Sequence, residues 1–254
     1  MATLSLAVLS ALAVLTVAMA WYLYAYLPRR LEERTFESIS AFSLAIELRF
    51  PSHQGLTARV VPLALAVGRL AGLSGRRLRN LELAAQLRDI GLCAVPYRLI
   101  NAKSFMRWSD SEQAVYAKHA ALGASMIEKA PTLRHLAKIV RSHHADAGSD
   151  PGIPLEAKVL RCVVDYIWCE RWQGEMLART QLQQGAGTAY DPRVVGILMD
   201  VLTSSRAAQP AQECEQVSLL VRGRLQGRHQ RFAFPIYARY LLSLKQMNRA
   251  IKAE

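Results

Sequence analysis

The hydrophobic pattern begins with an uninterrupted apolar stretch, ATLSLAVLSALAVLTVAMAWYLYAYL, from Ala2 to Leu27. The stretch contains no charged side chain, and a helix needs about 20 such residues to cross a bilayer. Aromatic residues between Trp21 and Tyr26 close it, as they do where a helix leaves the hydrocarbon region. We therefore expect residues 1–28 to form an uncleaved transmembrane anchor.

A cleaved signal peptide is the alternative, because Ala18-Met19-Ala20 resembles a small-x-small cleavage site. Against it, the stretch has no basic n-region and its apolar run continues past that point. Arg29, Arg30 and Arg34 follow directly. The positive-inside rule then predicts a single-pass protein whose main domain lies in the cytoplasm, with residues 29–41 as a juxtamembrane connector.

Beyond the connector, apolar residues recur every three or four positions, the spacing of helices that bury one face. Pro51 and Gly55 mark a break between two helices. The second helix is predicted to bury one stripe, formed by Val60, Leu63, Ala64, Val67, Leu70 and Ala71. Pro62 is expected in its first turn, where the missing N–H does no harm.

Two more helices carry polar residues toward the predicted core. One runs from about Arg77 to Asp89 and brings Arg88 to its inner end, with Asp89 beside it. The other opens after Ser109, because Ser109 and Glu112 have capping-box spacing. His119 is expected to point inward from this helix, since it shares an apolar face with three residues: Val115, Leu122 and Met126.

The segment PTLRHLAKIVRSHHAD, from Pro131 to Asp146, is predicted to be a helix that ends in two adjacent histidines. Its apolar residues recur at helical spacing, so His143 and His144 lie near the edge of a buried stripe. A single histidine on an apolar face is most often a hydrogen-bonded core residue. Several imidazoles that converge from rigid elements can instead hold a metal, and His119 is the natural third member.

The composition favours helices over sheet, because 52% of the 254 residues are hydrophobic and few β-branched residues alternate. The four cysteines show no C-x-x-C spacing, and we predict that they are reduced thiols. They are Cys93, Cys162, Cys169 and Cys214. The formal net charge is +12, and residues 221–254 hold eight basic residues against Glu254 alone. The C-terminal part of the chain, residues 206–254, is predicted to contain two helices, Gln216 to Arg224 and Pro235 to Lys252. We interpret it as a solvated hairpin, with binding of membrane phosphates or nucleic acid as the alternative.

Six segments between Phe42 and Leu198 resemble, in the same order, the motifs of the HD-GYP branch of the HD phosphohydrolase superfamily. They are AIELRFPSHQGLTARV (Ala45 to Val60), LAAQLRDIGLCAVP (Leu83 to Pro96), KHAALGASMI (Lys118 to Ile127), IVRSHHAD (Ile139 to Asp146), IPLEAKVL (Ile153 to Leu160) and GTAYDPRVVGIL (Gly187 to Leu198). The resemblance implies an all-α HD-domain helical bundle over residues 42–205. The transmembrane helix precedes it, and residues 206–254 form a C-terminal helical extension.

The same resemblance implies a two- or three-metal centre that hydrolyses cyclic di-GMP, a bacterial second messenger. Divalent ions in such a centre lower the pKa of bound water and neutralise the phosphodiester. Four residues stand where family ligands stand: Asp89, His119, His143 and His144. Iron, manganese or zinc suit these donors.

Several other positions depart from the family pattern. Phe50 stands in place of an acidic residue, Leu56 and Arg88 in place of histidines, Leu92 in place of a lysine, and Val164 in place of an aspartate, with Asp165 one position off. The loop with the G-Y-P signature is shortened to AGSDPGIP, from Ala147 to Pro154. Four of the seven ligand positions remain, and Arg88 adds a fixed positive charge where a dication would sit. Metal pairs are therefore expected to bind poorly.

We interpret the chain as a membrane-anchored, degenerate HD-GYP-like module of bacterial cyclic di-GMP-type signalling, in the cytoplasmic (inner) membrane. It is expected to bind cyclic di-GMP or a related nucleotide, or a protein partner, with little or no hydrolysis, and a homodimer is compatible with this role. Arg88 is expected to pair with Asp89 or a neighbour, and both Arg88 and Arg141 to contact the ligand. One divalent metal, or none, is expected on Asp89 and the three histidines.

Two alternatives stay open. The chain is an active phosphohydrolase if nearby carboxylates replace the missing ligands, for which Asp146, Asp150 and Asp165 are candidates. It is a structural membrane protein if its basic tail binds nucleic acid or lipid, although nucleic acid is not the expected partner under the first interpretation.

Overall fold

The computed structural model describes residues 2–101 and 108–207 of the chain. The expected tail helices and Cys214 lie outside the described residues. The chain divides into two compact units, Met1–Ser38 and Ile39–Glu254, and each is considered by itself.

The described part of the first unit is helical. Helix α1 spans Ala2–Trp21, a π-helical turn covers Tyr22–Tyr26, and α2 spans Leu27–Arg49, continuing into the second unit. One stretch of the continuous helix Ala7–Arg49 is apolar and long enough to cross a membrane, and none of that stretch is buried. A signal sequence near an N-terminus meets the same criterion, so length and composition permit the expected anchor without proving it.

In the described residues of the second unit, the regular elements are helices joined by turns and loops. After the end of α2 these are α3 (Leu56–Leu70), α4 (Gly75–Leu87), α5 (Tyr97–Asn101), α6 (Asp110–Ala117), α7 (His119–Glu128), α8 (Ala137–Arg141), α9 (Leu155–Gln173), α10 (Glu175–Gln184) and α11 (Pro192–Ala207). Short 3-10 helices cover Pro51–His53 (η2), Ile90–Ala94 (η3) and Arg134–Leu136 (η5). An isolated bridge between Ala186 and Tyr190 is the β-structure recorded in the described residues. The all-α prediction is confirmed.

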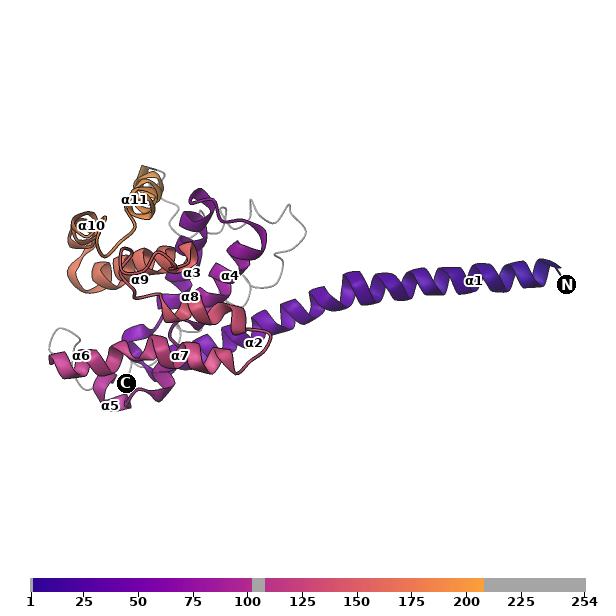
Figure 1. The fold of residues 1–254 in the computed structure, drawn as a ribbon, viewed down its shortest axis with the longest axis horizontal. Coiled ribbons are helices and arrows are strands. Elements are labelled where there is room, and N and C mark those ends of the chain that lie inside the picture. The colour runs from indigo at the N-terminus through magenta and orange to yellow at the C-terminus, as the bar shows by residue number, and fades with distance from the viewer. Residues whose placement is uncertain (1, 102–107, 208–254) are drawn as a thin grey trace, which may run out of the picture. The chain divides into compact units, whose positions relative to one another are not determined.

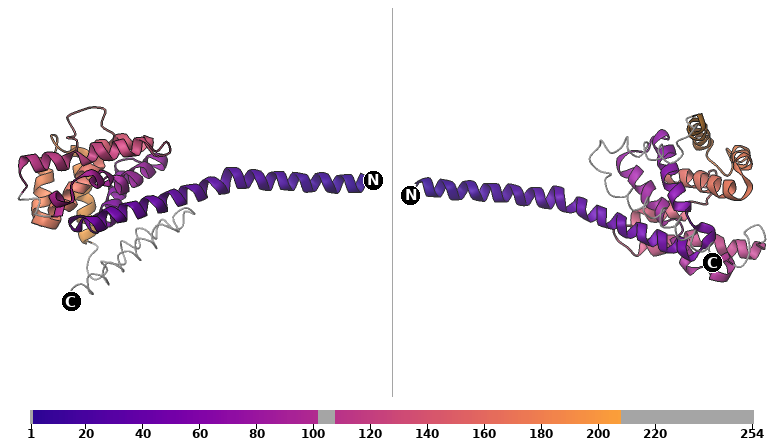
Figure 2. Two further views of the ribbon diagram at one scale, coloured as in Figure 1. Left: turned by 90° about the horizontal axis from the view of Figure 1, so that it is seen from below. Right: turned by 180° about the vertical axis from the view of Figure 1, so that it is seen from behind.

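Helix α9 is the centre of this bundle (Figure 1). It packs against α3, α4, α10 and α11, while α4 also contacts α3 and α8. Four fully buried side chains of α9 line the main core: Val159, Leu160, Val163 and Ile167. Figure 2 shows the later helices, drawn in magenta to orange, packed around the purple helices α3 and α4 from two further sides. Apolar burial on several faces of α9 therefore holds the bundle together.

A second, smaller apolar cluster lies apart from the main core. Its members come from the end of α2, from η3 and the residue after it, from α5 and from the residue before Ser109. They are Ile46, Phe50, Leu92, Val95, Ile100 and Trp108. Phe50 and Leu92 are both fully buried in it. These are two of the positions where the family pattern has charged side chains.

Glu47 fixes the start of α3. Its carboxylate accepts hydrogen bonds from the backbone N–H groups of Gly55, at 2.9 Å, and Thr57, at 2.6 Å. Helix termini leave such N–H groups unpaired, and Gly55, which has a left-handed φ of 76°, provides no side chain to cap them. Helix α3 therefore begins at Leu56, and Pro62 lies inside it rather than in its first turn. The expected place of Pro62 was wrong because this cap, supplied from α2, is not visible in the local sequence.

The apolar stripe predicted for α3 is largely present. Val60, Ala64, Val67 and Ala71 are buried, but Leu70 is 61% exposed. The helix ends at Leu70, and the turn that follows brings Leu73 into the core in its place.

The helix predicted after Ser109 begins with the expected capping box. Lys118 divides it into α6 and α7, and the buried face of α7 is not the predicted one. Small residues and one isoleucine line the buried face, namely Ala120, Gly123, Ala124 and Ile127, whereas Val115, Leu122 and Met126 are 37%, 38% and 44% exposed. Small residues are selected there because the backbone of α7 lies directly on η3.

Candidate metal site

The contact between η3 and α7 sets the position of His119. A Cβ atom on Gly91 would overlap the carbonyl oxygen of His119 and would lie 2.5 Å from the backbone nitrogen of Gly123. Only glycine allows two backbones to approach so closely. This approach brings Asp89, which directly precedes η3, close to the start of α7: His119 Nε2 lies 3.8 Å from Asp89 Oδ1.

Three histidines converge beside this contact. His119 begins α7, while His143 and His144 lie in the turn just after α8, rather than on a helix that continues to Asp146. The ring centroids are 5.3 Å apart for His119 and His143, 5.1 Å for His119 and His144, and 4.0 Å for the adjacent pair. One ligand atom from each histidine lies within 4.8 Å of the other two, so this histidine triad could hold a metal ion.

His119 and His143 are oriented as metal ligands usually are. Each donates its Nδ1–H to a main-chain carbonyl, that of Tyr116 at 2.7 Å and that of Val140 at 2.6 Å. A carbonyl oxygen can only accept, so the proton sits on Nδ1 and the lone pair on Nε2. Both Nε2 atoms are buried and have no hydrogen-bond partner. Two buried acceptors without a donor fit a metal, because an unpartnered buried acceptor is otherwise costly.

Burial keeps these imidazoles neutral. Desolvation is the largest cause that lowers the pKa of His143, to about 3, and it also lowers the pKa of His119 and of His144. The neighbouring imidazoles add to the effect at His143 and His144. Neutral imidazole is the form that binds metals.

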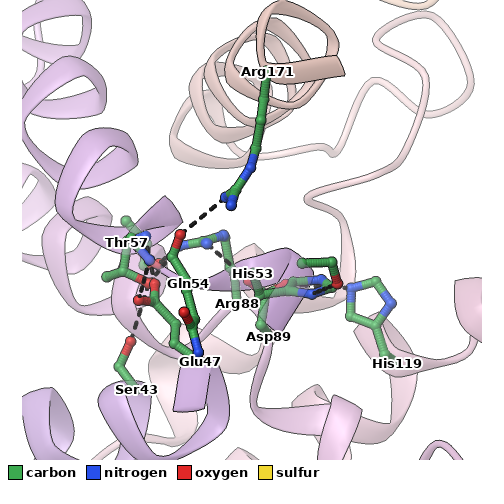
Figure 3. Close-up of polar contacts among 12 residues, drawn as sticks. Ser43, Glu47, His53, Gln54, Thr57, Arg88, Asp89, His119 and Arg171 are labelled. Carbon is green, nitrogen blue, oxygen red and sulfur yellow. Dashed lines mark hydrogen bonds and ion pairs between the residues drawn. The ribbon is translucent and has the colours of Figure 1, made fainter. Parts of the chain in front are cut away.

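Among the residues that the structure describes, Arg88 is the largest fully buried side chain, with 1% of its surface exposed. Its Nη2 lies 2.8 Å from Asp89 Oδ2, and its Nη1 donates to the carbonyl of Ala85 at 2.6 Å and to the hydroxyl of Thr57 at 3.3 Å. Figure 3 shows the polar side chains around Arg88 and Asp89, with Glu47 on one side and His119 on the other. The expected pairing of Arg88 with Asp89 is present.

Asp89 is held as a carboxylate by this arrangement. Burial alone would raise its pKa, but the Arg88 guanidinium, with smaller contributions from His53 and His119, lowers the pKa to about 2. The negative charge of Asp89 is therefore balanced inside the protein by the guanidinium.

His53 is a fourth histidine near this group, and the sequence interpretation missed it. Its Nε2 lies 3.2 Å from the hydroxyl of Tyr116 and its Nδ1 lies 2.9 Å from the hydroxyl of Ser52, while its ring packs 5.2 Å from that of Trp168. Burial lowers its pKa to about 4, against the attraction of Asp89. No helical or motif spacing connects it to the other histidines, because it lies in the short η2 turn.

The other residues predicted for the site make their contacts with residues other than the histidine triad. Arg141 is exposed and pairs with Glu128 at 2.8 Å, so its contact in the structure is with α7 and not with the histidine triad. Asp146 is 61% exposed and lies 3.4 Å from Arg161, and Asp150 accepts from the N–H of Gly152 in its own loop.

Asp165 accepts a hydrogen bond from the hydroxyl of Tyr190 at 2.9 Å and pairs with Arg161 at 3.3 Å. Among the described residues, the histidine triad is the group of convergent metal donors, and it includes neither Asp89 nor any of these three aspartates.

The residues at the positions that depart from the family pattern pack among apolar side chains. Leu56 is buried in the main core, and Phe50 and Leu92 lie in the smaller apolar cluster. Val164 packs at the edge of the main core.

Comparison with known proteins identifies the class to which this fold and site belong. The family model described as HD domain matches residues 41–194, so the chain belongs to the HD domain family. Cyclic di-GMP phosphodiesterase response regulator RpfG of Xanthomonas campestris pv. campestris is 28% identical over 204 residues, which cover 74% of this chain and 52% of the regulator. The chain thus spans about half the length of this curated relative.

A solved structure shares the fold. The crystal structure of a cyclic GMP-AMP specific phosphodiesterase from V. cholerae, V-cGAP3, superposes with a TM-score of 0.54 at 13% identity. The match covers 72% of this chain and 52% of that one. The predicted resemblance to HD phosphohydrolases is confirmed.

Proposed function

We propose that this chain is a membrane-anchored HD-domain module that binds a cyclic dinucleotide or a protein partner and hydrolyses little or none of the nucleotide. The nucleotide class is inferred from the names of the two similar proteins, which act on cyclic di-GMP and cyclic GMP-AMP. The anchor is inferred from the apolar helix, and the cytoplasmic side of the inner membrane from Arg29, Arg30 and Arg34.

The observation that carries the proposal is the buried pair of Arg88 and Asp89. A two-metal centre needs a carboxylate that bridges two cations, and Asp89 is here engaged by a guanidinium at 2.8 Å. Repulsion between that fixed charge and a dication ~5 Å away is several kcal/mol at an effective dielectric constant of ~20. Arg88 thus replaces a metal electrostatically while it cannot activate water.

The apolar positions support the same conclusion. Phe50 and Leu92 are fully buried with apolar neighbours, and charged ligands or metal-bound water would be poorly solvated there. The three candidate replacement aspartates are engaged in other hydrogen bonds or ion pairs. Hydrolysis with substituted ligands is therefore the weaker proposal.

The histidine triad is retained, and the residues present fit one divalent ion. His119 and His143 would hold it through their unpartnered Nε2 atoms, with Asp89 near by. A bound ion would supply a Lewis-acidic positive charge for a phosphate oxygen of the ligand. Iron, manganese or zinc suits these donors.

Hydrolysis and binding assays on the full chain in detergent micelles test the proposal. Cyclic di-GMP and cyclic GMP-AMP are incubated with the protein and excess Mn²⁺ or Fe²⁺, products are separated by chromatography, and metal is counted by elemental analysis. We expect micromolar binding of one nucleotide, at most one equivalent of metal and no multiple turnover. Repeated turnover with two equivalents of metal would overturn the proposal.

A further inference from the structure

Arg161, on α9, lies against the third histidine of the triad. Its Nη1 is 3.3 Å from His144 Nδ1, its Nη2 is 3.4 Å from Asp146 Oδ1, and its Nε is 3.3 Å from Asp165 Oδ2. The guanidinium also lies 5.6 Å from the centre of the Tyr190 ring. All three nitrogens of this partly buried side chain, which is 19% exposed, thus face partners around His144.

The contact with His144 fixes where that imidazole carries its proton. A guanidinium has only donors, so Nδ1 of His144 must be the acceptor. A neutral imidazole that accepts at Nδ1 carries its proton on Nε2. His144 is therefore the opposite tautomer of His119 and His143, whose Nδ1 atoms donate to carbonyls.

This tautomer is incompatible with metal binding through either nitrogen. Nδ1 has given its lone pair to Arg161, and Nε2 holds a proton where a metal would need a lone pair. If the proton moved to Nδ1, an N–H group would face the guanidinium donor and the hydrogen bond would be lost. A metal that recruits His144 must therefore displace Arg161 in both cases.

We propose that Arg161 is a positioning residue that keeps His144 out of metal coordination, so that Arg161 and a divalent cation compete for His144. This deepens the proposed function, because it rests on the single-metal site of the histidine triad. The positive charge of Arg161 and its pairing with Asp165 act in the same direction, since both reduce the negative potential that attracts a cation.

A double-mutant cycle on the full chain in micelles tests the competition, with Zn²⁺ as the probe and a chelator to set its free concentration. The variants are Arg161→Met, His144→Ala and the combination. Arg179→Met is the matched control, because Arg179 also pairs with an acidic residue four positions away on its own helix and is similarly exposed, 21% against 19%.

Arg161→Met should bind Zn²⁺ roughly tenfold more tightly than the wild type, the change expected when one charge-assisted hydrogen bond no longer competes. His144→Ala should change the wild-type affinity less than about threefold, yet abolish the gain in the Arg161→Met background. Arg179→Met should bind as the wild type does. A role of Arg161 in stability alone would give no such dependence on His144.

Three results would overturn the inference. The Zn²⁺ affinity of Arg161→Met could equal that of the wild type, or His144→Ala could lower the Zn²⁺ affinity as much in the wild type as in the Arg161→Met background. The third such result is that neither the wild type nor Arg161→Met binds Zn²⁺. These outcomes are separate from the hydrolysis assay. Turnover of cyclic di-GMP by the wild type would end the proposed function while leaving the measured competition intact.

Discussion

His119 and His143 use the same device to aim their Nε2 atoms. Each donates Nδ1–H to the carbonyl three residues before it, at 2.7 Å to Tyr116 and at 2.6 Å to Val140, and their ring centroids are 5.3 Å apart. Neither Nε2 atom has a hydrogen-bond partner. Two histidines on separate elements are thus arranged in the same way for one shared ligand, and the first prediction follows from this arrangement.

Zn²⁺ should stabilise the wild-type chain through these two histidines. At a concentration 100 times its Kd, a ligand that binds only the folded state adds about 2.7 kcal/mol to the free energy of unfolding. His119→Ala and His143→Ala should lose this gain, whereas His135→Ala, which alters an exposed histidine, should keep it. Thermal unfolding with and without Zn²⁺ measures the effect, and equal gains in all four proteins would contradict it.

Removing Arg88 should be costly because it leaves a buried carboxylate without its partner. Arg88→Met is expected to lower the free energy of unfolding by about 3–5 kcal/mol. Adding Asp89→Asn should restore more than half of that loss, since the unpaired charge disappears with it. Chemical unfolding followed by tryptophan fluorescence measures the cycle. Simply additive losses would mean that the two side chains do not act as a pair.

The buried His53 should make the fold sensitive to acid. Its pKa is lowered to about 4 in the folded chain from an ordinary 6.5, so below pH 6.5 the unfolded chain takes up a proton that the folded chain refuses. The stability contributed by neutral His53 is complete above pH 6.5 and is lost as the pH falls toward 4. Between pH 6.5 and 5 the loss is about 2 kcal/mol.

His53→Gln removes this titration while it can keep one hydrogen bond to Ser52 or Tyr116. The difference in unfolding free energy between the wild type and His53→Gln should therefore shrink by about 2 kcal/mol from pH 7 to pH 5. Unfolding curves at the two pH values measure this difference. Parallel pH profiles of the two proteins would show that His53 titrates normally.

Glu47→Gln should weaken the start of α3. The Glu47 carboxylate accepts hydrogen bonds from two backbone N–H groups. The side-chain amide of the Glu47→Gln variant would point its NH₂ group, which is a donor, at one of these N–H groups. A loss of about 1–3 kcal/mol is expected, because one buried donor would be left unpaired. Glu128→Gln is the control, since Glu128 is 47% exposed and its pair with Arg141 is worth about 0–1 kcal/mol. Equal losses in the two variants would contradict the capping role.

Gly91→Ala should separate η3 from α7 and displace His119. The added methyl would overlap the His119 carbonyl, and such overpacking typically costs about 1–3 kcal/mol. The stabilisation by Zn²⁺ should also be smaller in Gly91→Ala than in the wild type, because His119 would be displaced. Gly196→Ala, on α11, has no atom within 4 Å of its new Cβ and should be neutral or stabilising. Full Zn²⁺ stabilisation in Gly91→Ala would show that the close contact does not position the histidine.

Local patterns were sufficient to predict an all-helical fold, the capping box at Ser109 and the burial of His119 and His143, but not the bounds of the helix expected from Pro131 to Asp146, of which only Ala137–Arg141 is α-helical. They were not sufficient where a residue far along the chain decides the outcome. Pro62 lies inside α3 because Glu47 caps the helix earlier, and the buried face of α7 is rotated away from the predicted one because Gly91 allows the backbone of α7 to lie against η3. These are contacts between segments, and neither periodicity nor turn chemistry contains them.

Sequence reasoning found the residues of the candidate site that have helical or motif spacing. Helical spacing singled out His119, His143 and His144, the resemblance added Asp89, and the cost of an unpaired buried charge predicted the pairing of Arg88 with Asp89. His53 and Arg161 reach the site from η2 and α9 without any motif spacing. Only the folded chain brings these two side chains to the site.

The shared burial of Phe50 and Leu92 has a consequence for any charged residue introduced at either position. A charged side chain there would be enclosed by the apolar side chains of the small cluster, so it should lower the free energy of unfolding. The cluster therefore restricts both positions to apolar residues for as long as its other members are kept.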